Sequence, residues 1–254
     1  MEPSTTKTVR LDQITPASAQ ILHVAQGYLH ITNIPKNFNY ESFLLNTLEL
    51  GQLLEQPGGD NSTLVKPEPN YENRSDSRTS GSIPPHTDGP WLNTPVGILA
   101  LACHSPGEKV VPTCLHDMTR FITESLPLPL LNKALERPIN WKSDFSDDVK
   151  SAPIFEGKNQ KLITRYSQNM ILLGESSPNL KRSQNAFTHS SCDDFSYCFA
   201  ALYRDWSQKP QNQLHAYLQK GDLILFSNHR FTHEVEGNKS PSRCLERWFL
   251  SGEK

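Results

Sequence analysis

Apolar and polar residues alternate along short stretches of the chain, as they do in half-buried β-strands. One such stretch covers residues 27–35 and ends at Pro35. Residues 96–103 form a nearly continuous apolar run, which is typical of a strand buried on both faces. The same reasoning predicts one or two strands at residues 162–173, and one strand each at residues 222–226 and 244–250.

Apolar residues at helical spacing predict three helical regions, at residues 40–54, 118–135 and 193–206. The second contains Pro127 and Pro129, so we expect a broken helix or two short helices there. Many short strands with a few helices indicate an α+β, mainly β protein, built on a β-sandwich or jelly roll.

Residues 55–85 differ in composition from the segments on either side. They are rich in Asn, Ser, Asp, Pro and Gly, and only a few of them are strongly apolar, so the segment cannot build a core by itself. A loop of this length is either a flexible linker or a lid over a binding site. Because it leads directly to His86, we expect an active-site lid or flexible loop.

Composition narrows the classes of protein to consider. With 254 residues and 36% hydrophobic positions, the chain can bury a sizeable core in one large domain or two small ones. It has no apolar run long enough to span a membrane, and its first residues do not form a secretion signal, so we expect a soluble, cytoplasmic protein. The net charge of -2 and the lack of a basic cluster favour a small-molecule partner over nucleic acid or a membrane.

The five cysteines are odd in number and contain no C-x-x-C pair. This argues against a disulfide framework and against a structural zinc site. We expect buried free thiols.

The tripeptide His86-Thr87-Asp88 has the form of half a metal site. On an extended chain, residues two apart point to the same face, so the imidazole and the carboxylate converge while Thr87 points away. An H-x-D pair is common by chance, and an ordinary surface pair would look the same. A second half-site is therefore needed.

The segment GDLILFSNHRFTHE supplies two candidates for a third ligand, His229 and His233, and spacing alone leaves both open. Either would complete a set of two histidines and one carboxylate, which leaves one face of an octahedral iron free. Arg243 and Arg247 follow on one face of a predicted strand. Such a pair suits a carboxylate clamp, or it is a pair of arginines facing solvent.

Three motifs follow one another along the chain: H-x-D, then N-x-R-x-x-H and then R-x-x-x-R. Their order resembles that of the iron(II)- and 2-oxoglutarate-dependent oxygenases of the taurine dioxygenase-like superfamily. The PPHTDG opening and the pair His233-Glu234 resemble the clavaminate synthase-like and carbapenem synthase-like branch most. The resemblance is strong at residues 81–91 and 221–250 and faint but collinear elsewhere.

The resemblance implies a distorted double-stranded β-helix, or jelly roll, with flanking helices, in a single oxygenase domain over residues 1–254. It implies Fe²⁺ as the metal, 2-oxoglutarate as cosubstrate and O2 as oxidant. Asn228 and Arg230 match the family pattern, and this alignment selects His233 rather than His229 as the third metal ligand beside His86 and Asp88.

The resemblance also implies roles for other polar residues. Arg243 would bind the distal carboxylate of 2-oxoglutarate, with Thr113 as a loosely matched helper. Arg247 would meet an anionic group on the substrate, or support the cosubstrate arginine. Arg165 matches an Arg-Tyr stretch of amino-acid hydroxylases, although an arginine paired with a surface acid is the more conservative interpretation. Trp91 would either wall the substrate pocket or pack in the core.

The predicted activity is oxidative decarboxylation of 2-oxoglutarate coupled to C–H oxidation of a small polar metabolite, such as an amino acid or natural-product intermediate. Hydroxylation is the expected outcome, with desaturation or cyclisation as variants. The alternatives are a non-catalytic, cupin-like metal-binding jelly roll and a zinc hydrolase that uses the same three side chains. Arg243 argues against the cupin-like alternative, because a structural metal site has no use for a carboxylate clamp. A zinc hydrolase would not depend on O2 or 2-oxoglutarate. Substrate identity and oligomeric state stay open.

Overall fold

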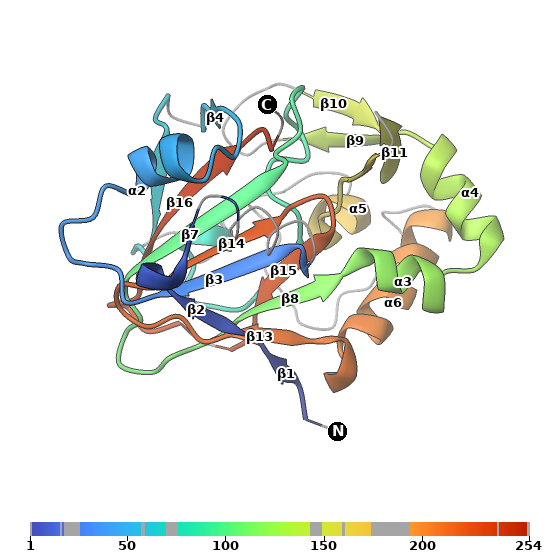
Figure 1. Cartoon of the computed structure of the whole chain (residues 1–254). Coiled ribbons are helices and arrows are strands. Elements are labelled where there is room, and N and C mark those ends of the chain that lie inside the picture. Colours follow the sequence, from blue (N-terminus) through green and yellow to red (C-terminus); the bar gives the residue numbers. More distant parts are fainter. Residues whose placement is uncertain are drawn as a thin grey trace.

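The fold is mainly β, with two large sheets and helices at their margins (Figure 1). The computed structural model describes residues 2–15, 17, 26–56, 59–69, 76–142, 149–158, 161–173, 194–237 and 239–252. Within these residues, no helix is both long and apolar enough to cross a membrane.

The smaller of the large sheets has five strands, in the order β1-β13-β8-β15-β6. Its strands are β1 (Ser4–Thr5), β13 (Leu214–Ala216), β8 (Thr113–Asp117), β15 (Phe231–Val235) and β6 (Ile83–His86). All of its pairs are antiparallel except β1 with β13.

The larger sheet has seven strands and contains the most apolar ones. Six of them follow the order β2-β3-β14-β7-β16-β4, and β5 pairs with β16 beside that path. They are β2 (Thr8–Arg10), β3 (Tyr28–Thr32), β14 (Leu223–Ser227), β7 (Ile98–Ser105), β16 (Cys244–Leu250), β4 (Leu53–Leu54) and β5 (Ser62–Val65). Two small hairpins complete the strands, β9 (Ile139–Lys142) with β10 (Val149–Ala152) and β11 (Phe155–Lys158) with β12 (Lys161–Thr164).

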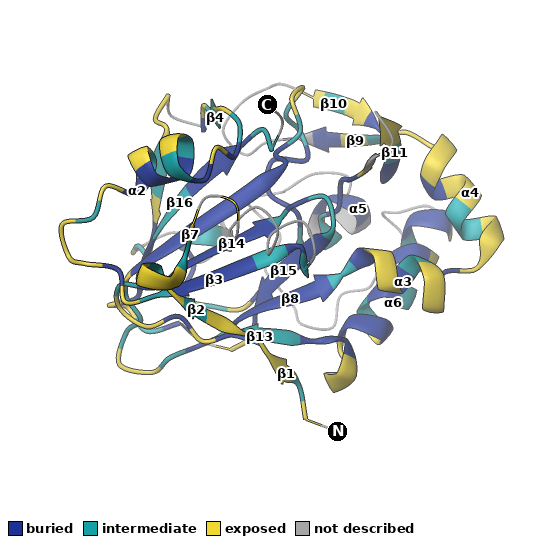
Figure 2. Cartoon of the chain, in the orientation of Figure 1, coloured by how far each residue is buried: buried dark blue, intermediate teal, exposed yellow. Residues whose placement is uncertain are grey.

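A shared apolar cluster joins the two large sheets. Leu101, Phe226 and Phe249 belong to the larger sheet, whereas Leu115 and Phe231 belong to the smaller one, and all five are buried in the same cluster. The central strands of the larger sheet are dark blue along nearly their whole length in Figure 2, which confirms the expectation of strands buried on both faces.

The helices lie beside the two large sheets (Figure 1). They are α2 (Tyr40–Ser42), which continues into the π-helical turn η2 (Phe43–Thr47), then α3 (Met118–Glu124), α4 (Leu128–Glu136), α5 (Gln168–Leu173) and α6 (Asp194–Ser207). Short 3-10 turns lie at η1 (Leu11–Gln13), η3 (Asp76–Arg78) and η4 (Pro210–Asn212). The apolar faces of α3 to α6 meet in one core cluster.

The strand predictions at residues 27–35, 96–103, 222–226 and 244–250 are confirmed, as are the broken helix at 118–135 and the helix at 193–206, whose first residue lies outside the described residues. Two predictions are wrong in part. The helical turn that begins at Tyr40 ends at Thr47, because Glu49 and Gly51 adopt positive φ of 50° and 94°. The segment 162–173 is a strand only to Thr164 and then forms α5, because its short apolar run fits either element.

The cysteines match the expectation only in part. Cys103 and Cys114 are buried free thiols, but Cys198 is exposed and Cys244 is half-buried. Cys198 lies on the outer face of α6, where a helix turns its polar side to solvent. Cys192 lies outside the described residues.

Candidate active site

Three predicted site residues come together where β6 meets β15. His86 ends β6 and is the direct antiparallel partner of His233 in β15, and their ring centroids lie 4.1 Å apart. Asp88 follows β6, with its Oδ2 3.6 Å from His233 Nε2. One nitrogen or oxygen from each of the three side chains lies within 4.8 Å of the others. His229 does not belong to this cluster.

The backbone around Asp88 is held on both sides. Thr87 points away from the cluster, as predicted, and its hydroxyl accepts a hydrogen bond from the Tyr166 amide at 3.0 Å. The Asn228 side chain accepts from the amide of Asp88 at 2.9 Å and donates to the carbonyls of Asp88 and Val96, both at 3.0 Å. The Asn of the N-x-R-x-x-H motif therefore fixes the position of the H-x-D motif.

The Arg of the same motif secures the turn before His233. The Arg230 guanidinium donates to Asp117 Oδ2 from Nε at 3.0 Å and from Nη2 at 2.7 Å. Asp117 also caps the start of α3 through the amides of Thr119 and Arg120. This links the turn before β15 to the end of β8 and to the helical layer.

Hydrogen bonding and burial leave the three side chains ready to bind a cation. His86 Nδ1 lies 2.9 Å from the Pro84 carbonyl, which can only accept, so Nδ1 is the donor of this bond and Nε2 is the ring nitrogen left for a metal. Among the described residues, the buried Asp88 Oδ2 has no hydrogen-bond partner. Two imidazoles and one carboxylate, with this unpaired oxygen between them, fit a divalent transition metal.

The pKa shifts of Asp88 and His233 also favour metal binding. Burial opposes ionisation of Asp88, but Arg247 and then His233 favour it, and the net effect lowers the pKa of that carboxyl below its usual value. Burial, reinforced by the neighbouring His86, lowers the pKa of His233 to about 3. Asp88 is therefore anionic and His233 neutral at neutral pH, which are the ligand forms of both groups.

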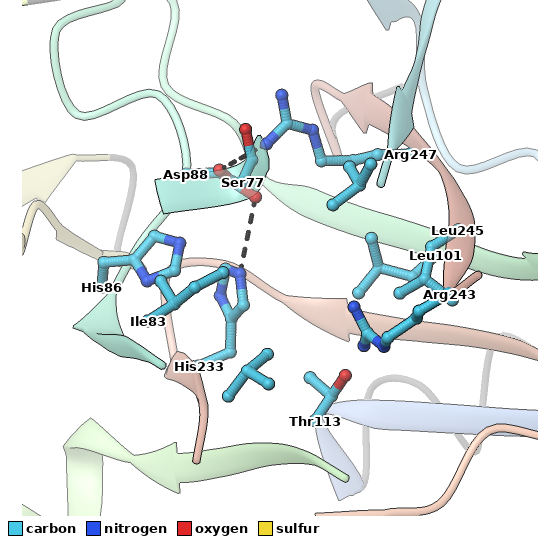
Figure 3. A pocket seen from close by; sticks show the side chains of 12 residues that line it. Ser77, Ile83, His86, Asp88, Leu101, Thr113, His233, Arg243, Leu245 and Arg247 are labelled. Atoms are coloured by element: carbon cyan, nitrogen blue, oxygen red, sulfur yellow. Dashed lines mark hydrogen bonds and ion pairs between the residues drawn. The ribbon is translucent and has the colours of Figure 1, made fainter. Parts of the chain in front are cut away.

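A pocket extends from this cluster toward Arg243 and Thr113 (Figure 3). Leu101 and Leu245 are among its apolar lining residues. The Arg243 guanidinium is buried, at 4% exposure, and within the described part of the chain it has no hydrogen-bond or ion-pair partner. Burial lowers its pKa, and the nearby Thr113 hydroxyl is also buried without a partner. A buried cation beside an orphaned hydroxyl calls for an anionic ligand.

Arg247 also lines the pocket, but its charge is already paired. Its Nη1 lies 3.0 Å from Asp88 Oδ1, and its Nε donates to Gln56 Oε1 at 3.1 Å. Sequence reasoning did not single out Gln56, because its role depends on the pairing of strands far apart in the chain.

Two residues assigned to the substrate lie elsewhere. Arg165 Nη1 donates to the carbonyls of Pro90 and Leu92, at 2.9 and 3.2 Å, and so holds the loop after Asp88 instead of lining the pocket. Arg165 Nη2 also lies 3.8 Å from Glu156 Oε2. Trp91 is half-buried and packs against the helical core cluster.

Sequence reasoning also missed a second group of metal-type side chains, Cys114, His116 and Glu234, on the buried strands β8 and β15. Glu234 follows His233 in its strand, so the two side chains point to opposite faces of the sheet. His116 Nε2 and Glu234 Oε1 lie 2.6 Å apart, so these two groups already bind each other.

No protein-family model matches the chain, and no curated protein matches its sequence. Solved structures do match. An asparagine oxygenase in complex with Fe(II), 3-hydroxyasparagine and succinate superposes with a TM-score of 0.69 and 14% identity, over 92% of this chain and 78% of the other. The non-haem iron oxygenase OrfP, in complex with Fe and alpha-ketoglutaric acid, superposes with a TM-score of 0.64 and 16% identity, over 94% of this chain and 79% of the other.

A third match is PvcB of Pseudomonas aeruginosa, an Fe- and alpha-ketoglutarate-dependent oxygenase from an isonitrile synthetic pathway. It gives a TM-score of 0.62 and 16% identity over 96% of this chain and 83% of the other. The chain has the fold of these oxygenases. The three superpositions cover 92% to 96% of this chain, so the structural similarity extends over nearly all of it.

Proposed function

We propose that the chain is a non-haem iron(II)- and 2-oxoglutarate-dependent dioxygenase. The main support is that one pocket contains two groups of polar side chains. A buried cluster of His86, Asp88 and His233 lies at one end. Arg243 and Thr113, whose side chains have no hydrogen-bond partner among the described residues, lie further along it. The shared fold supports it. We further infer that the two large sheets are the layers of a distorted double-stranded β-helix in a single oxygenase domain over residues 1–254.

In this proposal His86, Asp88 and His233 hold the iron, and Arg243 with Thr113 binds the distal carboxylate of 2-oxoglutarate. When bound, the iron and 2-oxoglutarate supply, with O2, the oxidising power for C–H oxidation. The protein orients and shields the reactants. Arg243 fixes one end of the cosubstrate by a charge-assisted pair, while Leu101 and Leu245 are part of the wall that keeps water from it.

The substrate in this proposal is a small polar metabolite, with free amino acids as the first class to test. The asparagine oxygenase was solved with 3-hydroxyasparagine, and OrfP with hydroxylated arginine. Of the three residues assigned to the substrate, Arg247 lines this pocket, whereas Arg165 and Trp91 are not among its lining residues. Because Arg247 is already paired with Asp88, we favour a structural ion pair over a contact with an anionic group on the substrate. A cytoplasmic location stays a prediction from the sequence.

Residues 55–85 are proposed to act as a lid. Val65, Ser77 and Ile83 of this segment line the pocket, and β5 attaches it to the edge of β16. Val65 of this segment is also buried in the apolar cluster that joins the two large sheets. Residues 57–58 and 70–75 lie outside the described residues.

The test is turnover in the presence of a panel of free L-amino acids with Fe²⁺, 2-oxoglutarate and O2. We expect succinate formation that requires iron, and at least one amino acid that gains the mass of one oxygen. Turnover with Zn²⁺ in the absence of O2 would favour the zinc hydrolase, and metal binding without any succinate would favour the cupin-like binding protein.

A further inference from the structure

Gln56 connects the proposed lid segment to the candidate metal cluster. Gln56 is 2% exposed and lies between β4 and β5, close to the end of β4. The amide nitrogen donates to the carbonyl of Arg247 at 2.7 Å and to that of Asn61 at 3.2 Å, and the amide oxygen accepts from Arg247 Nε at 3.1 Å. One buried amide therefore binds both the backbone and the side chain of Arg247.

These bonds determine where Arg247 points. A guanidinium is planar, so an acceptor at Nε fixes the direction of the Nη groups as well. Nη1 then lies 3.0 Å from Asp88 Oδ1, and the guanidinium carbon lies 4.6 Å from the ring centroid of Phe249, which supports it from one side. Gln56, Phe249 and Asp88 together hold the guanidinium.

The position of Arg247 in turn affects the Asp88 carboxylate. Oδ1 of Asp88 is bound to Arg247, while Oδ2 is buried, has no hydrogen-bond partner and lies 3.6 Å from His233 Nε2. We propose that Gln56 is a positioning residue that, through Arg247, locks the Asp88 carboxylate so that Oδ2 alone is presented to the metal. This inference rests on the proposed function of the same site.

A neutral residue gives a clean test of this proposal. Removing Arg247 would change the charge beside the metal as well as the orientation of Asp88, and the two effects on cation affinity have opposite signs. Gln56→Met keeps the size of the side chain and the charge of the site, and removes only the hydrogen bonds.

The experiment is calorimetric titration of the chain with Co²⁺ alone. A direct hydrogen-bond partner of a metal ligand typically contributes about 10- to 100-fold in metal affinity, and Gln56 is one residue further away, so we expect Gln56→Met to weaken Co²⁺ binding about 3- to 10-fold. As a matched control, Ser62→Ala removes a 2.7 Å hydrogen bond from the Ser62 hydroxyl to Glu246, between β5 and β16, and should leave Co²⁺ affinity unchanged.

A double-mutant cycle separates positioning from a general structural role. Arg247→Lys keeps the positive charge but cannot contact Gln56 and Asp88 together, so adding Gln56→Met to it should change Co²⁺ affinity by less than about 1.5-fold. An equal loss in both backgrounds, or an unchanged affinity in Gln56→Met alone, would overturn the proposal. A wild-type chain that binds no Co²⁺ would instead refute the proposed metal site itself.

Discussion

His86 and His233 face each other across one antiparallel strand pair, with ring centroids 4.1 Å apart, although they belong to two motifs that lie far apart in the sequence. The register of β6 against β15 brings the two halves of the cluster together, and Asn228 then ties the backbone of Asp88 to the turn before β15. The metal-type side chains are therefore positioned by backbone pairing and not by a flexible loop.

Replacing Arg243 tests the cosubstrate assignment. Arg243→Ala should weaken 2-oxoglutarate binding by about 2 to 5 kcal/mol, which is about 30- to 5,000-fold, because the distal carboxylate loses a buried charge-assisted partner. Titration of the Fe²⁺-loaded chain with 2-oxoglutarate under anaerobic conditions measures this. Arg120→Ala, which removes an exposed ion pair with Glu124, is the control and should have no effect. Equal affinity in wild type and Arg243→Ala would contradict the assignment.

Asn228 should matter for stability as well as for metal binding. Its amide satisfies one backbone N–H and two carbonyls and is 2% exposed, so Asn228→Ala leaves buried polar groups without partners. We expect a loss of about 2 to 4 kcal/mol in the free energy of unfolding, measured with urea. Asn46→Ala, at an exposed position whose amide donates to the Ser42 hydroxyl, should change the free energy of unfolding by less than about 0.5 kcal/mol.

The metal-free chain should lose stability as the pH falls. The pKa of His233 is about 3 in the folded chain, below its ordinary value of 6.5, because of burial and then His86. Between these two values the unfolded state binds a proton that the folded state does not, so the unfolding free energy decreases toward low pH, by up to about 1.4 kcal/mol per pH unit. Urea unfolding after chelation, compared between wild type and His233→Gln, isolates this effect. An identical pH slope in the two proteins would show that His233 does not cause it.

The lid proposal predicts a change in hydrogen exchange. Because Ser77 and Ile83 line the pocket, amides in residues 76–83 should exchange more slowly once Co²⁺ and 2-oxoglutarate are bound. Amides of β3, a strand of the larger sheet with no residue in the lining of this pocket, serve as the internal reference and should not change. Unaltered exchange at residues 76–83 would favour a plain connecting segment.

Much of the fold follows from local patterns. The buried strand β7 and the helix α6 are visible in the sequence because their apolar periodicity is long and regular. The start of α5 and the early end of the helical turn after Tyr40 are not visible, since the first depends on packing against α6 and the second on positive φ at Glu49 and Gly51.

In the candidate site, too, some residues could be selected from the sequence and others could not. His86, Asp88 and His233 could be selected because chemistry restricts metal ligands to a few residue types in recognisable motifs. The contact of Gln56 with Arg247 and the pairing of Arg247 with Asp88 could not, because they depend on how strands distant in sequence align. Arg165 was assigned to the substrate by motif, but its hydrogen bonds to two loop carbonyls were not predictable without coordinates.

The most direct test of the central claim is the release of labelled CO2 from 2-oxoglutarate labelled at its first carbon, without any added substrate. We predict release by the wild-type chain that requires both Fe²⁺ and O2 and falls at least about 100-fold in His233→Ala, because the metal loses one of its three protein ligands. Release at the same rate without iron, or no release by the Fe²⁺-loaded wild-type chain, would contradict the account.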